Sequence, residues 1–171
     1  MKVLVSAASR HGATAEIARA LGDVLIAGGI EADVLRPEEV MTVAPYDGVV
    51  VGSGVYAGRW LDPAKNLIAR ESAGLSSKPV WLFSSGPIGD PPKPEEEPTD
   101  VARLRDSTHA IDHRVFPGRL DRRQLGFAEK AMVAVVHAPD GDFRHWDAVA
   151  DLAVSIARQL QTAPAGGSQE R

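Results

Sequence analysis

Short continuous apolar runs alternate along the chain with longer stretches that have a helical period. Continuous runs at residues 2–6, 49–53 and 79–84 are typical of parallel strands covered on both faces. A short alternating pattern predicts an edge strand over residues 31–36, and a fifth strand is expected over residues 114–117. The sequence therefore predicts five strands separated by longer connections.

Helical patterns fill these connections. The first helix is expected to begin at Thr14 as its N-cap and to end at Gly28, and others are expected over residues 63–73, 99–110 and 143–160. Strands that alternate with helices predict a three-layer α/β domain with a parallel sheet. The core-facing positions of the first and last helices are expected to be Ile17, Ala18, Leu21, Val24, Leu25, Trp146, Val149, Ala150, Ala153, Ile156, Ala157 and Leu160.

The composition is that of a single globular domain. The 171 residues are expected to form one domain over residues 1–161, followed by a polar, disordered tail over residues 162–171. A formal net charge of −4 argues against a nucleic-acid partner. There is no secretory signal pattern and no apolar run near the ~20 residues of a membrane span, so a cytoplasmic location is expected.

The absence of cysteine narrows the chemistry. It excludes disulfides, thiolate nucleophiles, iron–sulfur clusters and cysteine-based zinc sites. Among the five histidines only His109 and His113 have a close spacing, and we expect them to be structural or solvated, so no metal site is predicted. No Walker loop or nucleophile elbow is present. Any redox reaction would therefore depend on a bound cofactor.

Three loops follow the carboxyl ends of strands, where open α/β sheets bind their ligands. Residues 7–13 lead into a helix N-terminus, whose unpaired N–H groups suit a phosphate; the alternative is a tight turn that binds nothing. Residues 53–60 offer Tyr56, favoured over Trp60, for contact with a planar ring, whereas Trp60 alternatively belongs to the core. Residues 84–90 either contact the ligand edge through their backbone or form a Pro/Gly turn without a ligand.

Three sequence motifs occur in the same order as in a known family. They are Ser-Arg-His-Gly-Ala-Thr at residues 9–14, Val-Gly-Ser-Gly-Val-Tyr-Ala-Gly-Arg-Trp at residues 51–60 and Gly-Asp-Phe-Arg-His-Trp at residues 141–146. Through them nearly the whole chain resembles the flavodoxin-like family, and most closely the branch that includes menaquinone-dependent protoporphyrinogen dehydrogenase. The resemblance implies a five-stranded sheet of order 2-1-3-4-5 and FMN as the cofactor. Ala8 stands where many relatives carry a hydroxyl.

The resemblance and the three loops together give a set of candidate FMN-binding residues. The phosphate is expected at the backbone N–H groups and hydroxyls of the first loop, and the ring beside the second and third loops. The full set is Ser9, Arg10, His11, Gly12, Ala13, Thr14, Ser53, Gly54, Val55, Tyr56, Ala57, Gly58, Ser85, Gly86, Pro87 and Gly89. No catalytic acid or base is assigned, because nothing in the sequence places Arg144 or His145 at the flavin.

The function that the resemblance implies is an FMN-dependent oxidoreductase. A protoporphyrinogen dehydrogenase-like enzyme of haem biosynthesis would take electrons from a reduced organic donor and pass them to a quinone or a soluble acceptor. An electron-transfer flavodoxin serving protein partners is the first alternative, although its usual strongly acidic character is weak here. A flavodoxin-fold interaction module without FMN is the second.

An insertion over residues 119–142 separates the last strand from the last helix. Its apolar residues recur at helical spacing, beside the basic residues Arg122, Arg123 and Lys130. Such a helix could cover the flavin as a lid for a substrate or quinone, or contact a membrane surface peripherally. It could equally pack on the domain or on the partner in a homodimer. The stripe consists of Leu125, Ala128, Met132, Val135 and Val136.

Overall fold

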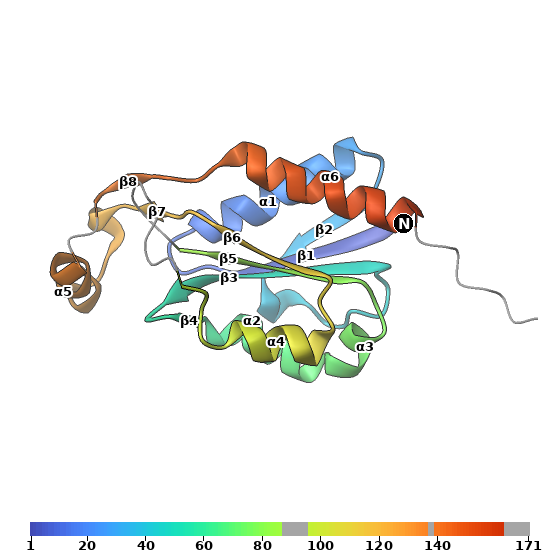
Figure 1. The fold of residues 1–171 in the computed structure, drawn as a ribbon, viewed down its shortest axis with the longest axis horizontal. Helices are drawn as coiled ribbons and strands as arrows, with labels where there is room; N and C mark the ends of the chain where they lie inside the picture. The colour runs from blue at the N-terminus through green and yellow to red at the C-terminus, as the bar shows by residue number, and fades with distance from the viewer. Residues whose placement is uncertain (87–95, 137–138, 163–171) are drawn as a thin grey trace, which may run out of the picture.

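A sheet of five parallel strands in the order β2-β1-β3-β5-β6 lies at the centre of the structure (Figure 1). The computed structural model describes residues 1–86, 96–136 and 139–162. This order confirms the predicted fold class, and the strands begin and end within a few residues of the expected positions. Their bounds are Lys2–Ala8 for β1, Glu31–Leu35 for β2, Gly48–Tyr56 for β3, Val80–Ser85 for β5 and Asp112–Phe116 for β6.

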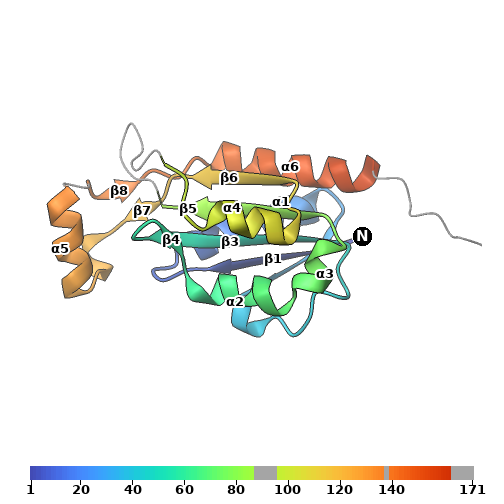
Figure 2. The same ribbon diagram turned by 60° about the horizontal axis from the view of Figure 1, so that its bottom comes forward.

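Helices cover both faces of this sheet (Figures 1 and 2). On one face lie α1 (Ala13–Ala27) and α6 (Trp146–Thr162), and on the other lie α2 (Asp62–Arg70), α3 (Ser72–Ser76) and α4 (Val101–Thr108). A short 3-10 helix, η1 (Pro37–Glu39), follows β2. The three layers are those expected from the alternation of strands and helices.

The helix predicted over residues 63–73 is two helices. Glu71 lies between α2 and α3 with non-helical torsion angles, and its carboxylate accepts a hydrogen bond from Val43 N at 2.9 Å. The helix is therefore interrupted at Glu71, whose side chain binds the backbone of the distant Val43. The last helix continues to Thr162, so the predicted tail begins one residue too early, and its remaining residues, 163–171, lie outside the described residues.

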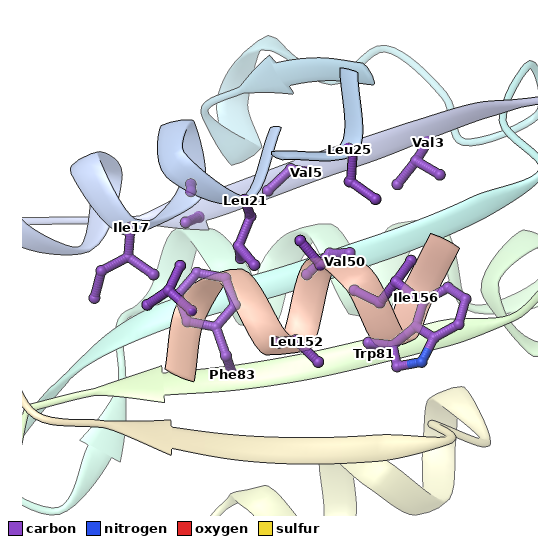
Figure 3. Close-up of a cluster of buried hydrophobic side chains, with 14 of the residues drawn as sticks. Val3, Val5, Ile17, Leu21, Leu25, Val50, Trp81, Phe83, Leu152 and Ile156 are labelled. Carbon is purple, nitrogen blue, oxygen red and sulfur yellow. The ribbon is translucent and has the colours of Figure 1, made fainter. Parts of the chain in front are cut away.

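The core under α1 and α6 is built around large side chains of β5. The rings of Trp81 and Phe83 are fully buried between the sheet and these helices (Figure 3). The prediction that Trp146 joins this core is wrong: Trp146 is 43% exposed at the start of α6, with the Arg144 guanidinium 4.6 Å from its ring centroid. Leu152 is buried instead, one of the α6 residues that face α1.

The strand β3 continues further than predicted and turns back as a hairpin. Val55 and Tyr56 pair in antiparallel fashion with β4 (Arg59–Trp60), so the predicted loop over residues 53–60 is largely strand. Ala57 and Gly58 form the two-residue turn, with φ of 49° and 71°. Two successive positive φ angles suit the right-handed twist of a tight hairpin.

The insertion lies beyond the carboxyl end of the sheet (Figures 1 and 2). Its base is a small antiparallel pair of β7 (Arg119–Leu120) and β8 (Gly141–Asp142), and between them lie η2 (Arg122–Gln124) and α5 (Phe127–Val136). No helix in the described ranges combines the length and the apolar character that crossing a membrane requires.

Gly52 in β3 is predicted to be indispensable for packing. A Cβ atom at this position would lie 2.1–2.5 Å from ring atoms of the buried Phe83. We expect Gly52→Ala to lower the free energy of unfolding by about 1–3 kcal/mol, because the rigid ring or the strand must shift. Urea denaturation measures this change.

Gly28→Ala is the matched control for this substitution. A Cβ at Gly28 would make only ordinary contacts of 3.4 Å with helix carbonyls, so we expect a change within about 0.5 kcal/mol. Equal unfolding midpoints for the two variants would show that the packing of the Phe83 ring does not require a glycine at residue 52.

Candidate functional site

The turn between β1 and α1 presents unpaired backbone donors. Gly12 is the N-cap of α1 with φ of 87°, and the first helical hydrogen bond runs from Glu16 N to Gly12 O at 3.0 Å. The amides of residues 13–15 therefore have no helical acceptor, and the positive end of the helix dipole lies at them. This arrangement can bind an anion such as a phosphate.

Thr14 does not cap α1 as the sequence suggested. Gly12 takes that position because it adopts a left-handed conformation at low cost, and Thr14 becomes a buried residue of the first helical turn. Ser9 closes the turn, since its Oγ accepts a hydrogen bond from Gly12 N at 3.0 Å. The Ser9 hydroxyl proton is thereby left available to a bound anion.

The first and second candidate loops meet at Gly54. A Cβ atom on Gly54 would lie 3.2 Å from both Thr14 Oγ1 and Tyr56 Cε2. Tyr56 is half-buried, and burial raises the pKa of its phenol, which is therefore neutral at physiological pH. An aromatic ring thus stands beside the phosphate-type turn.

Arg10 and His11, at the tip of the first loop, also contact this ring. The Arg10 guanidinium lies 4.3 Å from the Tyr56 ring centroid, within the range of a cation–π interaction. The His11 ring meets Tyr56 in an edge arrangement with centroids 6.2 Å apart. The structure therefore brings together most of the candidates from these two loops.

The third loop approaches the second through its first residues. A Cβ atom on Gly86 would lie 3.1 Å from Val55 Cβ, and Gly86 N donates to Phe116 O at 3.3 Å. Ser85, the last residue of β5, is buried. The candidates Pro87 and Gly89 lie outside the described residues.

Two candidates of the second loop, Ser53 and Gly58, have structural partners. The Ser53 hydroxyl donates to Gly54 O at 2.7 Å and accepts from Leu61 N at 2.9 Å, which holds the hairpin to the start of α2. Gly58 O accepts from Thr99 N at 2.9 Å, and Ala57 lies exposed at the turn. Their contact with a cofactor stays a prediction.

Trp60 belongs to the core and to a buried polar chain. It is 2% exposed, and its indole Nε1 donates to Ser84 Oγ at 2.7 Å. Ser84 Oγ lies 2.8 Å from His113 Nε2, and His113 Nδ1 lies 3.1 Å from Glu97 Oε1. Because indole only donates, the simplest assignment has Ser84 donating to a neutral His113, whose Nδ1–H donates to Glu97.

The hydrogen bonds of His113 explain why His109 and His113, which are close in sequence, do not form a pair. His113 is buried in β6, whereas His109 ends α4 in a left-handed conformation and is exposed. Across residues 1–86, 96–136 and 139–162, no group of three or more His, Cys, Asp or Glu side chains is placed to hold a metal ion.

Ion pairs fasten the base of the insertion to α1. Glu16, in the first turn of α1, accepts from Arg144 Nη1 at 2.5 Å and from Arg119 at 3.3 Å. Arg144 also binds Asp142 at 2.6 Å, and its side chain is only 4% exposed. No local sequence pattern indicates this cluster, because Arg119, Asp142 and Arg144 lie more than a hundred residues from Glu16.

Glu129 of α5 binds the tip of the first loop. Its Oε1 accepts from Arg10 Nη1 at 2.9 Å and lies 3.1 Å from His11 Nε2. Its Oε2 accepts from Gly126 N at 2.9 Å. The Gly126 amide first, and then Arg10 and His11, lower the pKa of Glu129 to about 2, so the carboxylate is ionised at physiological pH.

The apolar stripe predicted for α5 is exposed at Ala128, Met132 and Val135, of which Met132 is 56% and Val135 77% exposed. Phe127, which the predicted stripe did not include, is 92% exposed at the start of α5. The alternative in which this helix buries its stripe against the sheet domain is therefore wrong. An exposed set of large apolar side chains is typical of a surface that meets a ligand, a partner or a membrane.

We predict that His113 makes stability depend on pH. Burial is the main cause that lowers the pKa of His113 from 6.5, outweighing the effect of Glu97. As pH falls from about 7.5 to about 5.5, the unfolded chain takes up a proton more readily than the folded chain, so stability is lost. Urea unfolding at the two pH values should show a larger loss for the wild type than for His113→Gln, and equal losses would exclude His113 as the cause.

Three comparisons agree with this architecture. The model of the family described as flavodoxin domain matches residues 4–146. The chain is 26% identical, over 92% of its length and 95% of the relative, to the protein named protoporphyrinogen IX dehydrogenase [quinone] from Escherichia coli K12. Similar solved structures include a flavodoxin from the domain Archaea (16% identity, TM-score 0.65, 94% and 99% of the two chains) and the Flv1 flavodiiron core from Synechocystis sp. PCC6803 (15%, 0.67, 95% and 36%). The chain belongs to the flavodoxin domain family.

Proposed function

We propose that the chain binds FMN at the carboxyl edge of the sheet and works as an FMN-dependent oxidoreductase. Family membership implies a flavin. The observation that carries the proposal is the contact at Gly54, where the Thr14 hydroxyl and the Tyr56 ring converge on a backbone without a side chain. A turn with free amides for one phosphate and an aromatic residue for one ring thereby form one continuous site.

The residues of this site fit a flavin mononucleotide. The amides of residues 13–15 and the hydroxyls of Ser9 and Thr14 would hold a single phosphate. Tyr56 would stack against the ring, and the backbone at Gly86 would border it. When bound, FMN supplies one- and two-electron chemistry, while this chain supplies position and electrostatics.

For the reaction, we propose a protoporphyrinogen dehydrogenase-like activity. The similarity to the E. coli protein extends over 92% of this chain and 95% of that protein. The exposed side chains Phe127, Met132 and Val135 offer an apolar surface next to the first loop for a hydrophobic donor or a quinone, or for peripheral contact with a membrane. Electrons would pass from a reduced organic donor to the flavin and then to a quinone or a soluble acceptor.

The phosphate turn is tested by combining Gly12→Val with Thr14→Ala. The first change forbids the left-handed N-cap, and the second removes a phosphate donor. We expect FMN to bind at least about 100-fold more weakly, by fluorescence titration, because two or more charge-assisted hydrogen bonds are lost. Riboflavin, which has no phosphate, is the control ligand and should lose much less affinity.

An unchanged FMN affinity in the folded double variant would place the phosphate elsewhere. Circular dichroism establishes that this variant folds. A wild-type protein that stays colourless and takes up no FMN would contradict the proposed function and favour the interaction module.

The reaction is tested by anaerobic turnover of protoporphyrinogen with a menaquinone analogue. We expect a rate above that of free FMN at the same concentration. A protein that retains FMN but shows no such rate would favour the electron-transfer flavodoxin. Removing the apolar surface with Phe127→Ser and Val135→Ser should raise the KM for the hydrophobic substrates while leaving the bound flavin spectrum unchanged.

A further inference from the structure

Glu129 binds the same loop that the proposed function assigns to a phosphate. Arg10 and His11 are the two residues at the tip of the turn closed by Ser9 and Gly12, directly before the unpaired amides of residues 13–15. Both side chains point to one oxygen of Glu129, at 2.9 and 3.1 Å. Two charged or chargeable side chains of the loop that carries the candidate phosphate donors are thus bound by a carboxylate of the chain itself.

A carboxylate and a phosphate would oppose each other at this place. Glu129 is ionised, and a phosphate monoester carries up to two negative charges near neutral pH. Like charges that share one guanidinium and one imidazole repel, and the repulsion is strongest where water is partly excluded. Arg10 and His11 therefore bind one of the two anions more favourably than both at the same time.

The link between Glu129 and the loop is the kind of contact that an external anion can replace. Arg10 keeps a side-chain exposure of 48% and Glu129 one of 22%, so the ion pair is partly open to solvent. By contrast, the Arg144 side chain that holds the base of the insertion is 4% exposed and bound by Glu16 and Asp142. A competing anion would therefore free α5 and leave β7 and β8 attached.

We propose that Glu129 is an internal anion that competes with a phosphate for Arg10 and His11, so that phosphate binding at the loop releases α5. The proposal rests on the proposed function in that the phosphate is that of FMN. Because coupling between two sites is reciprocal, a phosphate that weakens the docking of α5 is itself bound more weakly while α5 is docked, so removing Glu129 strengthens phosphate binding.

Hydrogen exchange with inorganic phosphate as the probe tests the proposal. In the wild type, saturating phosphate at constant ionic strength should speed amide exchange across residues 127–136 at least about fivefold, while residues 146–162 stay unchanged. In Glu129→Gln the exchange of residues 127–136 should be fast without phosphate, and phosphate should bind several-fold more tightly. Loss of a merely structural contact would not tighten this binding.

Asp151→Asn is the matched control, because it removes one negative charge from an exposed position on α6. It should leave both the exchange of residues 127–136 and the phosphate affinity as in the wild type. The proposal is overturned if Glu129→Gln binds phosphate equally or more weakly than the wild type. It is also overturned if saturating phosphate leaves the exchange of residues 127–136 unchanged.

Parallel titrations with FMN separate this proposal from the proposed function. Uptake of FMN without faster exchange in residues 127–136 overturns the competition and leaves the flavin function standing. Phosphate-dependent release without any uptake of FMN supports the competition and contradicts the flavin function. A protein that binds neither phosphate nor FMN contradicts both.

Discussion

Parallel pairing of β1 with β3 is the constraint on which the candidate site depends. The register runs from Val3 opposite Gly48 to Ala8 opposite Ser53, and β3 continues against β5 to Gly54 opposite Ser85. These strands are buried on both faces, so a slip of one residue would exchange the side chains of the two cores. The register therefore fixes the level at which the three loops leave the sheet, and the loops meet because they leave it together.

The sequence predicted what depends on local patterns. Continuous apolar runs located the five parallel strands, and helical periodicity located α1, α4 and α6 within a few residues. The hairpin after Gly54 escaped prediction because its turn uses Ala57 in a left-handed conformation, instead of the Asn-Gly or Asp-Gly pair that usually signals such a turn. Likewise Thr14 was a reasonable N-cap by residue type, and only the backbone angle of Gly12 shows which residue caps the helix.

The rest of the site depends on contacts between distant parts of the chain, for which a single sequence holds no pattern. Glu129 is a suitable residue for the start of a helix after Gly126, but nothing near it indicates that it reaches Arg10. For Trp60 the sequence left the ligand ring and the core as alternatives, and its place in the core is decided by a hydroxyl from β5, which an imidazole from β6 holds in turn. The stripe on α5 was visible as a pattern, yet a pattern shows that a helix has an apolar face and not what covers it.

The insertion is attached to α1 and to the loop before it by two groups of ion pairs that differ in how easily an external anion can replace them. At its base, the Arg144 side chain is 4% exposed and is held by both Glu16 and Asp142, so an external anion would have to displace two carboxylates from a buried cation. At α5, Glu129 binds Arg10, which is 48% exposed, and His11, which is 24% exposed, and an ion pair that is partly exposed to water adds less net stability than a buried one. Motion of the insertion is therefore expected at α5, between fixed ends.

Since α5 also carries Phe127 and Val135, a change of charge at the phosphate-type turn acts directly on the exposed apolar surface of the insertion. The Glu129 carboxylate thereby connects the phosphate-type turn with the exposed apolar surface of α5.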